Sequence, residues 1–184
     1  DYKIRLLDGL SSADSHHSAN SFQLGPDGAL YYSRGIFNKK ALETPYGPFR
    51  SSADGVYRFD PLTFATSFHF PVGPNPHGDV FDQWGYQFAT DATGGTGYYI
   101  NVGKGQRARQ LYEQKVRHVP GIGILSSEHF PARYNGQLLI ANVIGFQGIK
   151  MHDFKYEGAD IKAVEKGDLI SSTDPNFRPS GMDV

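Results

Sequence analysis

Hydrophobic and polar residues alternate over short stretches of this chain, and turn-forming residues separate these stretches. The alternation is clear in residues 63–70, where Phe64, Phe68 and Phe70 are an even number of positions apart. Even spacing places side chains on one face of a β-strand. Helical spacing is faint and is found in residues 106–116 alone, so the sequence predicts an all-β fold with many turns.

One pattern recurs along the chain: a tight turn that contains glycine, followed by an apolar strand. It occurs at Gly28, Gly85 and Gly136. The copies are roughly 50 to 60 residues apart, close to the ~40 to 50 residues expected for the blade of a β-propeller. We therefore predict a β-propeller in which these three glycines occupy equivalent turns. At that spacing, the 184 residues cover about four blades.

Composition narrows the classes of partner. Eighteen Lys and Arg residues against nineteen Asp and Glu residues give a net charge of −1, which provides no basic field for nucleic acid. No apolar run approaches the ~18 residues of a membrane helix. Because the chain has no cysteine, disulfides, thiol nucleophiles, zinc–cysteine sites and covalently attached haem are excluded within these residues.

The ends of the sequence suggest a piece of a larger protein. It begins at Asp1 without a start methionine, and residues 182–184 resemble the first strand of another blade. We expect residues 1–184 to form a partial β-propeller domain of a longer chain. The remaining blades or a partner chain would then pair with its open edges.

Loops that precede the innermost strands of a propeller converge at one end of its central channel. This rule would bring together His16, His17, Asn75, His77 and Arg178. Imidazoles titrate near neutral pH and are therefore suited to general acid–base chemistry. The same argument predicts that the other histidines lie elsewhere, namely His69, His118 and His152.

Two phrases, residues 17–28 (HSANSFQLGPDG) and 75–78 (NPHG), resemble the catalytic-histidine and asparagine motifs of soluble quinoprotein glucose dehydrogenases and sorbosone dehydrogenase-like proteins. Further phrases resemble the propeller of planctomycete-type membrane-bound dehydrogenases. They are residues 120–123, 126–131, 142–148 and 171–179. This second resemblance spans nearly the whole chain. It implies a six-bladed propeller of a bacterial protein that is periplasmic or extracellular.

The resemblance implies an oxidoreductase of the sugar or alcohol dehydrogenase type. His17 would be the general base that takes a proton from a sugar hydroxyl while a hydride passes to pyrroloquinoline quinone. Asn75, His77 and Arg178 would contact the quinone, and His16 would contact the substrate. A c-type cytochrome would be the electron acceptor.

The resemblance also implies a calcium ion that polarises the quinone, held by the turn at Thr93 and Gly94. Two positions differ from the quinoprotein pattern. Pro74 stands where those proteins carry an arginine before the asparagine, and His16 replaces the acidic residue beside their catalytic histidine. A glycine-rich turn also forms without a metal, because glycine tolerates positive φ.

Two other classes of function remain open. The chain could be a non-catalytic propeller scaffold or a ligand-binding module of a multidomain exported protein, since a fold does not determine a function. Alternatively, His16, His17 and His77 could bind a transition metal. Adjacent histidines in a strand point to opposite faces, so the metal hypothesis requires His16 and His17 to lie in a loop.

Overall fold

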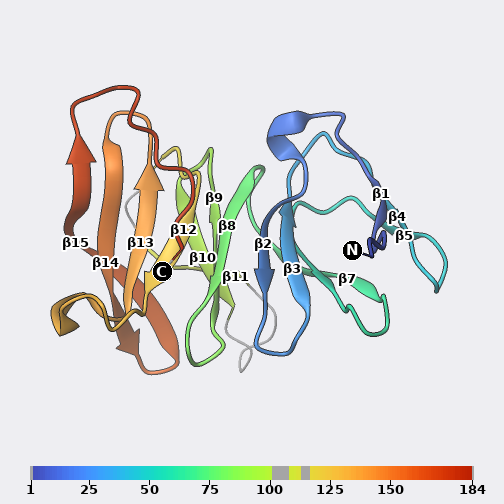
Figure 1. Cartoon of the computed structure of the whole chain (residues 1–184), viewed down its shortest axis with the longest axis horizontal. Coiled ribbons are helices and arrows are strands. Elements are labelled where there is room, and N and C mark those ends of the chain that lie inside the picture. Colours follow the sequence, from blue (N-terminus) through green and yellow to red (C-terminus); the bar gives the residue numbers. More distant parts are fainter. Residues whose placement is uncertain (1, 101–107, 113–116, 184) are drawn as a thin grey trace.

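The structure, a computed structural model, describes residues 2–100, 108–112 and 117–183. Within these residues the chain is all-β and forms four antiparallel sheets (Figure 1). The helices of this part are short 3₁₀ turns that include η1 (Ser15–His17) and η3 (Ala132–Tyr134), and none of those described is suited to crossing a membrane. The all-β prediction is confirmed.

Three of the sheets are four-stranded and follow one another along the chain, as the blades of a propeller do. Blade 1 consists of β2 (Asn20–Leu24), β3 (Leu30–Arg34), β6 (Gly55–Phe59) and β7 (Thr66–Pro71). Blade 2 consists of β8 (Pro76–Phe81), β9 (Gln87–Asp91), β10 (Thr96–Ile100) and β11 (Ala108–Gln110). Blade 3 consists of β12 (Ile122–Leu125), β13 (Gln137–Asn142), β14 (Gln147–Glu157) and β15 (Asp160–Ser172).

The fourth sheet has three strands and packs on blade 1. It contains β1 (Asp8–Leu10), β4 (Lys40–Glu43) and β5 (Phe49–Ser51). The last two come from the long segment between β3 and β6. Leu42 of β4 is buried against Tyr32 and Tyr57 of blade 1, so this sheet covers one face of the blade.

The recurring glycines do occupy equivalent turns. Gly28, Gly85 and Gly136 each precede the second strand of a blade, with φ of 78°, 84° and 76°. Residues other than glycine rarely adopt such angles, which explains why the repeat was visible in the sequence. In contrast, the segment 106–116 is not shown to be helical: its residues 108–110 form strand β11, and residues 106–107 and 113–116 lie outside the described part.

The core lies between neighbouring blades. Tyr31, Val56 and Phe70 of blade 1 pack against Ala89 and Ile100 of blade 2. A second cluster joins blades 2 and 3, and includes Phe88, Tyr99, Leu111, Leu138, Ile140 and Ile161. Each blade therefore buries an apolar face on the next, which fixes the position of the first strands β2, β8 and β12 beside one another.

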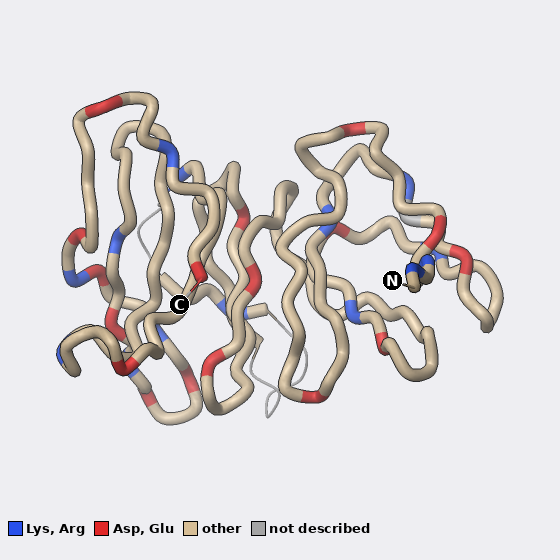
Figure 2. The backbone as a smooth tube through the Cα atoms, viewed as in Figure 1, with Lys and Arg blue, Asp and Glu red and all other residues tan. Residues whose placement is uncertain are grey.

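Acidic and basic residues are interspersed over all the blades (Figure 2). Exposed pairs such as Lys166 with Asp153, whose nitrogen and oxygen are 3.2 Å apart, neutralise each other locally. Each blade therefore carries charges of both signs within its described residues.

Candidate functional site

The loops that enter β2, β8 and β12 lie at the same end of the blades (Figure 1). This follows from the topology, because the three first strands run in the same direction. The turn η1 precedes β2, and Asn75 directly precedes β8. We call this end the loop face.

The histidine at the end of η1 is paired with a carboxylate. Asp14 caps η1 by accepting a hydrogen bond from the His16 N–H at 2.9 Å. The Nδ1 atom of His17 lies 3.2 Å from the Asp14 carboxylate, at ion-pair distance but without the alignment of a hydrogen bond. A carboxylate beside Nδ1 orients an imidazole and stabilises its protonated form, so this pair is suited to general-base chemistry.

The carboxylate of this pair is ionised at neutral pH. Burial works to raise the pKa of Asp14, but the His16 N–H and the His17 ring outweigh it and hold the pKa below its usual value. Sequence reasoning missed Asp14 because it sought an acid directly beside His17. The signal was present three residues earlier, in the capping position of the turn.

A segment of residues 35–39, which we call the strap, holds the pair in place. Buried Asn38 donates to the Asp14 C=O at 2.9 Å and accepts from the Asp14 N–H at 3.2 Å. Gly35 donates to the His17 C=O at 3.1 Å. A Cβ atom on Gly35 would lie 2.9 Å from the His17 ring and 2.8 Å from the Pro74 oxygen, so this close approach requires glycine.

His77 lies near His17 and is held by blade 3. Burial lowers the pKa of His77, and the nearby His17 lowers it further. A hydrogen bond from the ring to the Pro120 C=O partly offsets these effects. His77 is therefore neutral at pH 7. Its ring N–H donates to the Pro120 C=O, and this hydrogen bond links β8 of blade 2 to the loop that enters blade 3.

Asn75 lies in the loop before β8 and contacts the turn that follows β9. Its side-chain NH₂ donates to the Thr93 hydroxyl at 3.2 Å, and its backbone N–H donates to the Asp91 carboxylate at 3.1 Å. The Asn75 Oδ1 atom is buried and has no hydrogen-bond partner. The Asn75 Oδ1 atom can therefore accept a hydrogen bond, and none of the described residues donates one to it.

The calcium predicted at Thr93 and Gly94 stays a prediction, and the carboxylate next to this turn is already hydrogen-bonded. The Gly94 N–H donates to the buried Asp91 carboxylate at 2.9 Å, so the turn directs N–H donors rather than oxygens at that group. The described residues hold no cluster of three or more His, Cys, Asp or Glu side chains arranged for a metal ion. This applies equally to the transition-metal hypothesis for His16, His17 and His77.

The two remaining predicted residues lie at the margin of this cluster or outside it. The His16 side chain is 88% exposed, and its Nδ1 atom lies 3.6 Å from the Asp14 carboxylate. Arg178 is exposed, and its Nε donates to Pro175 in its own loop at 3.3 Å. The carboxylates of pyrroloquinoline quinone need cationic partners. His17, His77 and Asn75 supply neither a lysine nor an arginine side chain, so this set of residues does not fit the cofactor.

The prediction for the other histidines holds for His69 and His152, which lie within strands β7 and β14. It is wrong for His118. The N–H of Val119, the residue after His118, donates to the Ala92 C=O. This hydrogen bond places His118 and Val119 beside the turn that contains Thr93. The long connection from blade 2 back to β12 brings it there, a path that strand alternation does not reveal.

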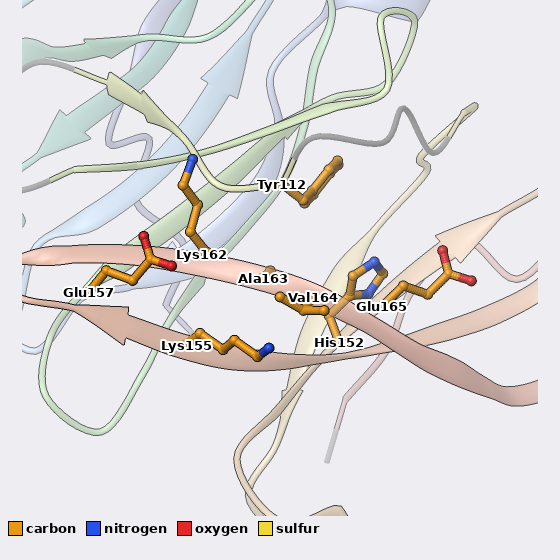
Figure 3. A pocket seen from close by; sticks show the side chains of 8 residues that line it. All are labelled: Tyr112, His152, Lys155, Glu157, Lys162, Ala163, Val164 and Glu165. Carbon is orange, nitrogen blue, oxygen red and sulfur yellow. The ribbon is translucent and has the colours of Figure 1, made fainter.

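A hollow of about 430 Å³ lies away from the loop face, between blade 3 and the segment after β11 (Figure 3). Its lining includes Tyr112, Lys155, Lys162 and buried His152, whose ring centre is 5.7 Å from that of Tyr112. Burial lowers the pKa of His152, although nearby Glu165 opposes this effect. Sequence reasoning did not find the hollow, because no motif marks these residues within the alternation of two long strands.

Residues 1–120 match the family described as a domain of unknown function (DUF7133), which covers more than half of the chain. The chain belongs to the DUF7133 family. None of the curated proteins matches this DUF7133 chain.

A solved X-ray structure, provisionally described as a gluconolactonase, is similar to 90% of the DUF7133 chain and to 50% of its own length. The TM-score is 0.55 and the sequence identity is 14%. The chain therefore spans about half the length of that structure. At this identity the likeness shows the fold, and it confirms a β-propeller. The resemblance to planctomycete-type dehydrogenases stays a prediction.

Proposed function

We propose that the loop face binds a small polyhydroxylated molecule, a sugar or a sugar derivative, and that His17 acts on it as a general base. The observation that carries this proposal is the Asp14–His17 pair, 3.2 Å apart at the loop face. In the proton-transfer step, the substrate O–H bond breaks and its proton moves to the imidazole. The O–H electron pair stays on the substrate oxygen.

The resemblance of residues 17–28 to quinoprotein motifs favours an oxidoreductase, because deprotonation of a hydroxyl prepares its carbon to release hydride. The hydride, with its two electrons, passes to a separate two-electron acceptor, which the assay below supplies as an artificial dye because the described cluster does not fit pyrroloquinoline quinone. An exported location and a c-type cytochrome partner, also implied by the resemblance, belong to the same proposal. Fractionation of the source cells and co-purification would test these two points.

The experiment is an assay of the full-length protein against a panel of aldoses, with an artificial electron acceptor and with or without added quinone and Ca²⁺. We expect His17→Ala to lower turnover by about 10²- to 10⁴-fold, the usual effect of losing a general base. Asp14→Asn should lower turnover to a lesser extent. His129→Ala is the matched control, because His129 is exposed in a separate loop.

A second candidate function, a non-catalytic scaffold, is favoured by the hydrogen bonds of His77 and Asn75. Both side chains tie neighbouring loops together, with Pro120 and Thr93 as their partners. If no sugar is converted, and His17→Ala changes thermal stability alone, the scaffold becomes the better account. Sugar turnover that is unchanged in His17→Ala would contradict the general-base role.

A further inference from the structure

Blade 1 contains a fully buried guanidinium that pairs with none of the carboxylates in the described part of the chain. Arg34, at the end of β3, is 0% exposed. Its Nη2 donates to the Lys39 C=O at 2.8 Å, but Nε and Nη1 have no hydrogen-bond partner among the described residues. The ionisable groups that act on Arg34 are Tyr32 and Tyr57, and both are neutral phenols at pH 7.

This arrangement is costly for an isolated chain. An arginine side chain keeps its charge in proteins. A buried charge without a counter-charge destabilises the fold, and each buried N–H without an acceptor adds to the cost. A group that accepts hydrogen bonds from Nε and Nη1 would remove both penalties.

A third donor comes from Tyr32, which acts electrostatically on Arg34. Its hydroxyl is also buried and has no hydrogen-bond partner among the described residues. Tyr32 and Arg34 lie on the same face of β3, because they are two positions apart. The neighbouring Tyr57 differs, since its hydroxyl contacts the Ala53 C=O at 2.6 Å and the Ser51 hydroxyl at 2.9 Å.

We propose that Arg34 and Tyr32 form a binding site for a small oxyanion, a carboxylate or a phosphate, within blade 1. Two guanidinium N–H groups and one hydroxyl match the acceptor-only chemistry of such an ion, and planar carboxylates suit the fork of arginine. The site is separate from the Asp14–His17 pair, but the strap connects them. Lys39 of the strap contacts Arg34, and Asn38 contacts Asp14.

A hollow of about 390 Å³ lies outside this site, lined by residues 36–39, 51, 52 and 54. Lys39 is among its lining residues, and the Lys39 C=O accepts from Arg34, so the strap connects the hollow to the guanidinium. The oxyanion at this site is either a free ion or the carboxylate group of an acidic sugar whose remaining part reaches the loop face.

The test measures thermal unfolding while acetate or phosphate replaces chloride at constant ionic strength. A ligand that binds the native state alone raises the midpoint as its concentration rises. We expect this for the wild-type protein and not for Arg34→Met. Tyr32→Phe keeps the ring packing and should need about tenfold more anion for the same shift, because one hydrogen bond to a charged group is lost. Tyr57→Phe is the matched control and should respond like wild type.

Parallel titrations with galacturonate, galactose and acetate distinguish the two sources. A response to both acetate and galacturonate supports a free-ion site, and a response to galacturonate alone supports the carboxylate of a sugar. The proposal is overturned if the wild-type midpoint does not respond to any of the anions. It is also overturned if Arg34→Met responds as strongly as wild type, since that is a general salt effect. Should Arg34→Met fail to fold, an unchanged response in Tyr32→Phe contradicts the site.

Discussion

Asp79 offers a test of how the inter-blade core sets stability. It lies on β8, is 6% exposed, and its two carboxylate oxygens accept from the Gln87 side-chain NH₂ at 2.9 and 3.0 Å. Burial raises the pKa of Asp79 from 3.8 to about 7, although the Gln87 hydrogen bonds oppose the increase. The folded state therefore prefers the protonated carboxyl.

The sign of the pH effect follows from this preference. Because the folded-state pKa exceeds the unfolded value, Asp79 contributes fully below about pH 4. Its contribution declines as pH rises through 7. Each pKa unit corresponds to about 1.4 kcal/mol, so the loss between pH 5 and pH 8 is about 3 kcal/mol. Burial lowers the pKa of His69, His77 and His152. Protonation of these histidines destabilises the fold as pH falls, which is opposite to the pH dependence of Asp79.

Asp79→Asn removes the ionisation but keeps the shape. Its new NH₂ group can also donate to the buried Gln87 Oε1 atom, which meets no geometric hydrogen-bond donor among the described residues, although Gln87 also interacts with the His69 ring. We expect the free energy of unfolding of this variant, relative to wild type, to increase by about 3 kcal/mol from pH 5 to pH 8. Urea denaturation across this pH range measures the difference, and subtraction removes the histidine contributions.

Asp153→Asn is the matched control. Asp153 also accepts from a glutamine, Gln137, at 3.1 Å, but its side chain is 45% exposed and lies 3.2 Å from the Lys166 ammonium, so its charge is compensated in the folded state. The control should therefore show little change with pH relative to wild type. The reasoning about Asp79 is refuted if Asp79→Asn parallels wild type across the range, or if it is the less stable protein at pH 8.

Two further predictions concern the strap. Asn38→Ala removes both hydrogen bonds to the Asp14 backbone and should destabilise the protein by about 1–3 kcal/mol, measured by denaturant unfolding; a variant as stable as wild type would contradict the role of Asn38. Gly35→Ala forces a Cβ against the His17 ring, and overpacking of this kind should cost about 1–3 kcal/mol. In the sugar assay both variants should also lose turnover, because each displaces the Asp14–His17 pair.

The sequence allowed the blade repeat to be predicted because its signal is local. A turn that needs positive φ selects glycine, so Gly28, Gly85 and Gly136 marked three blades directly. The sheet β1–β4–β5 was not foreseen, because it joins strands far apart in the chain. The estimate of about four blades corresponds to four sheets, of which three are four-stranded.

The candidate site was predictable in outline. Topology brings His17, His77 and Asn75 to the loop face, as the convergence of loops suggested. The partner of His17 was not predicted, because it depends on how η1 turns Asp14 back toward the ring. Burial of Arg34 was equally hidden, since arginine in a strand is usually exposed, and a sequence does not report which face a later sheet will cover.

The central claim, that the Asp14–His17 pair meets a sugar-like ligand, is tested most directly by NMR of the histidine side chains. The ¹⁵N signals of the imidazoles are followed while neutral sugars and sugar acids are added to the full-length protein. The account predicts a saturable change in the His17 signals and no change in those of His152, which lies in blade 3 away from the loop face. Saturable sugar binding that leaves the His17 signals unchanged would contradict it.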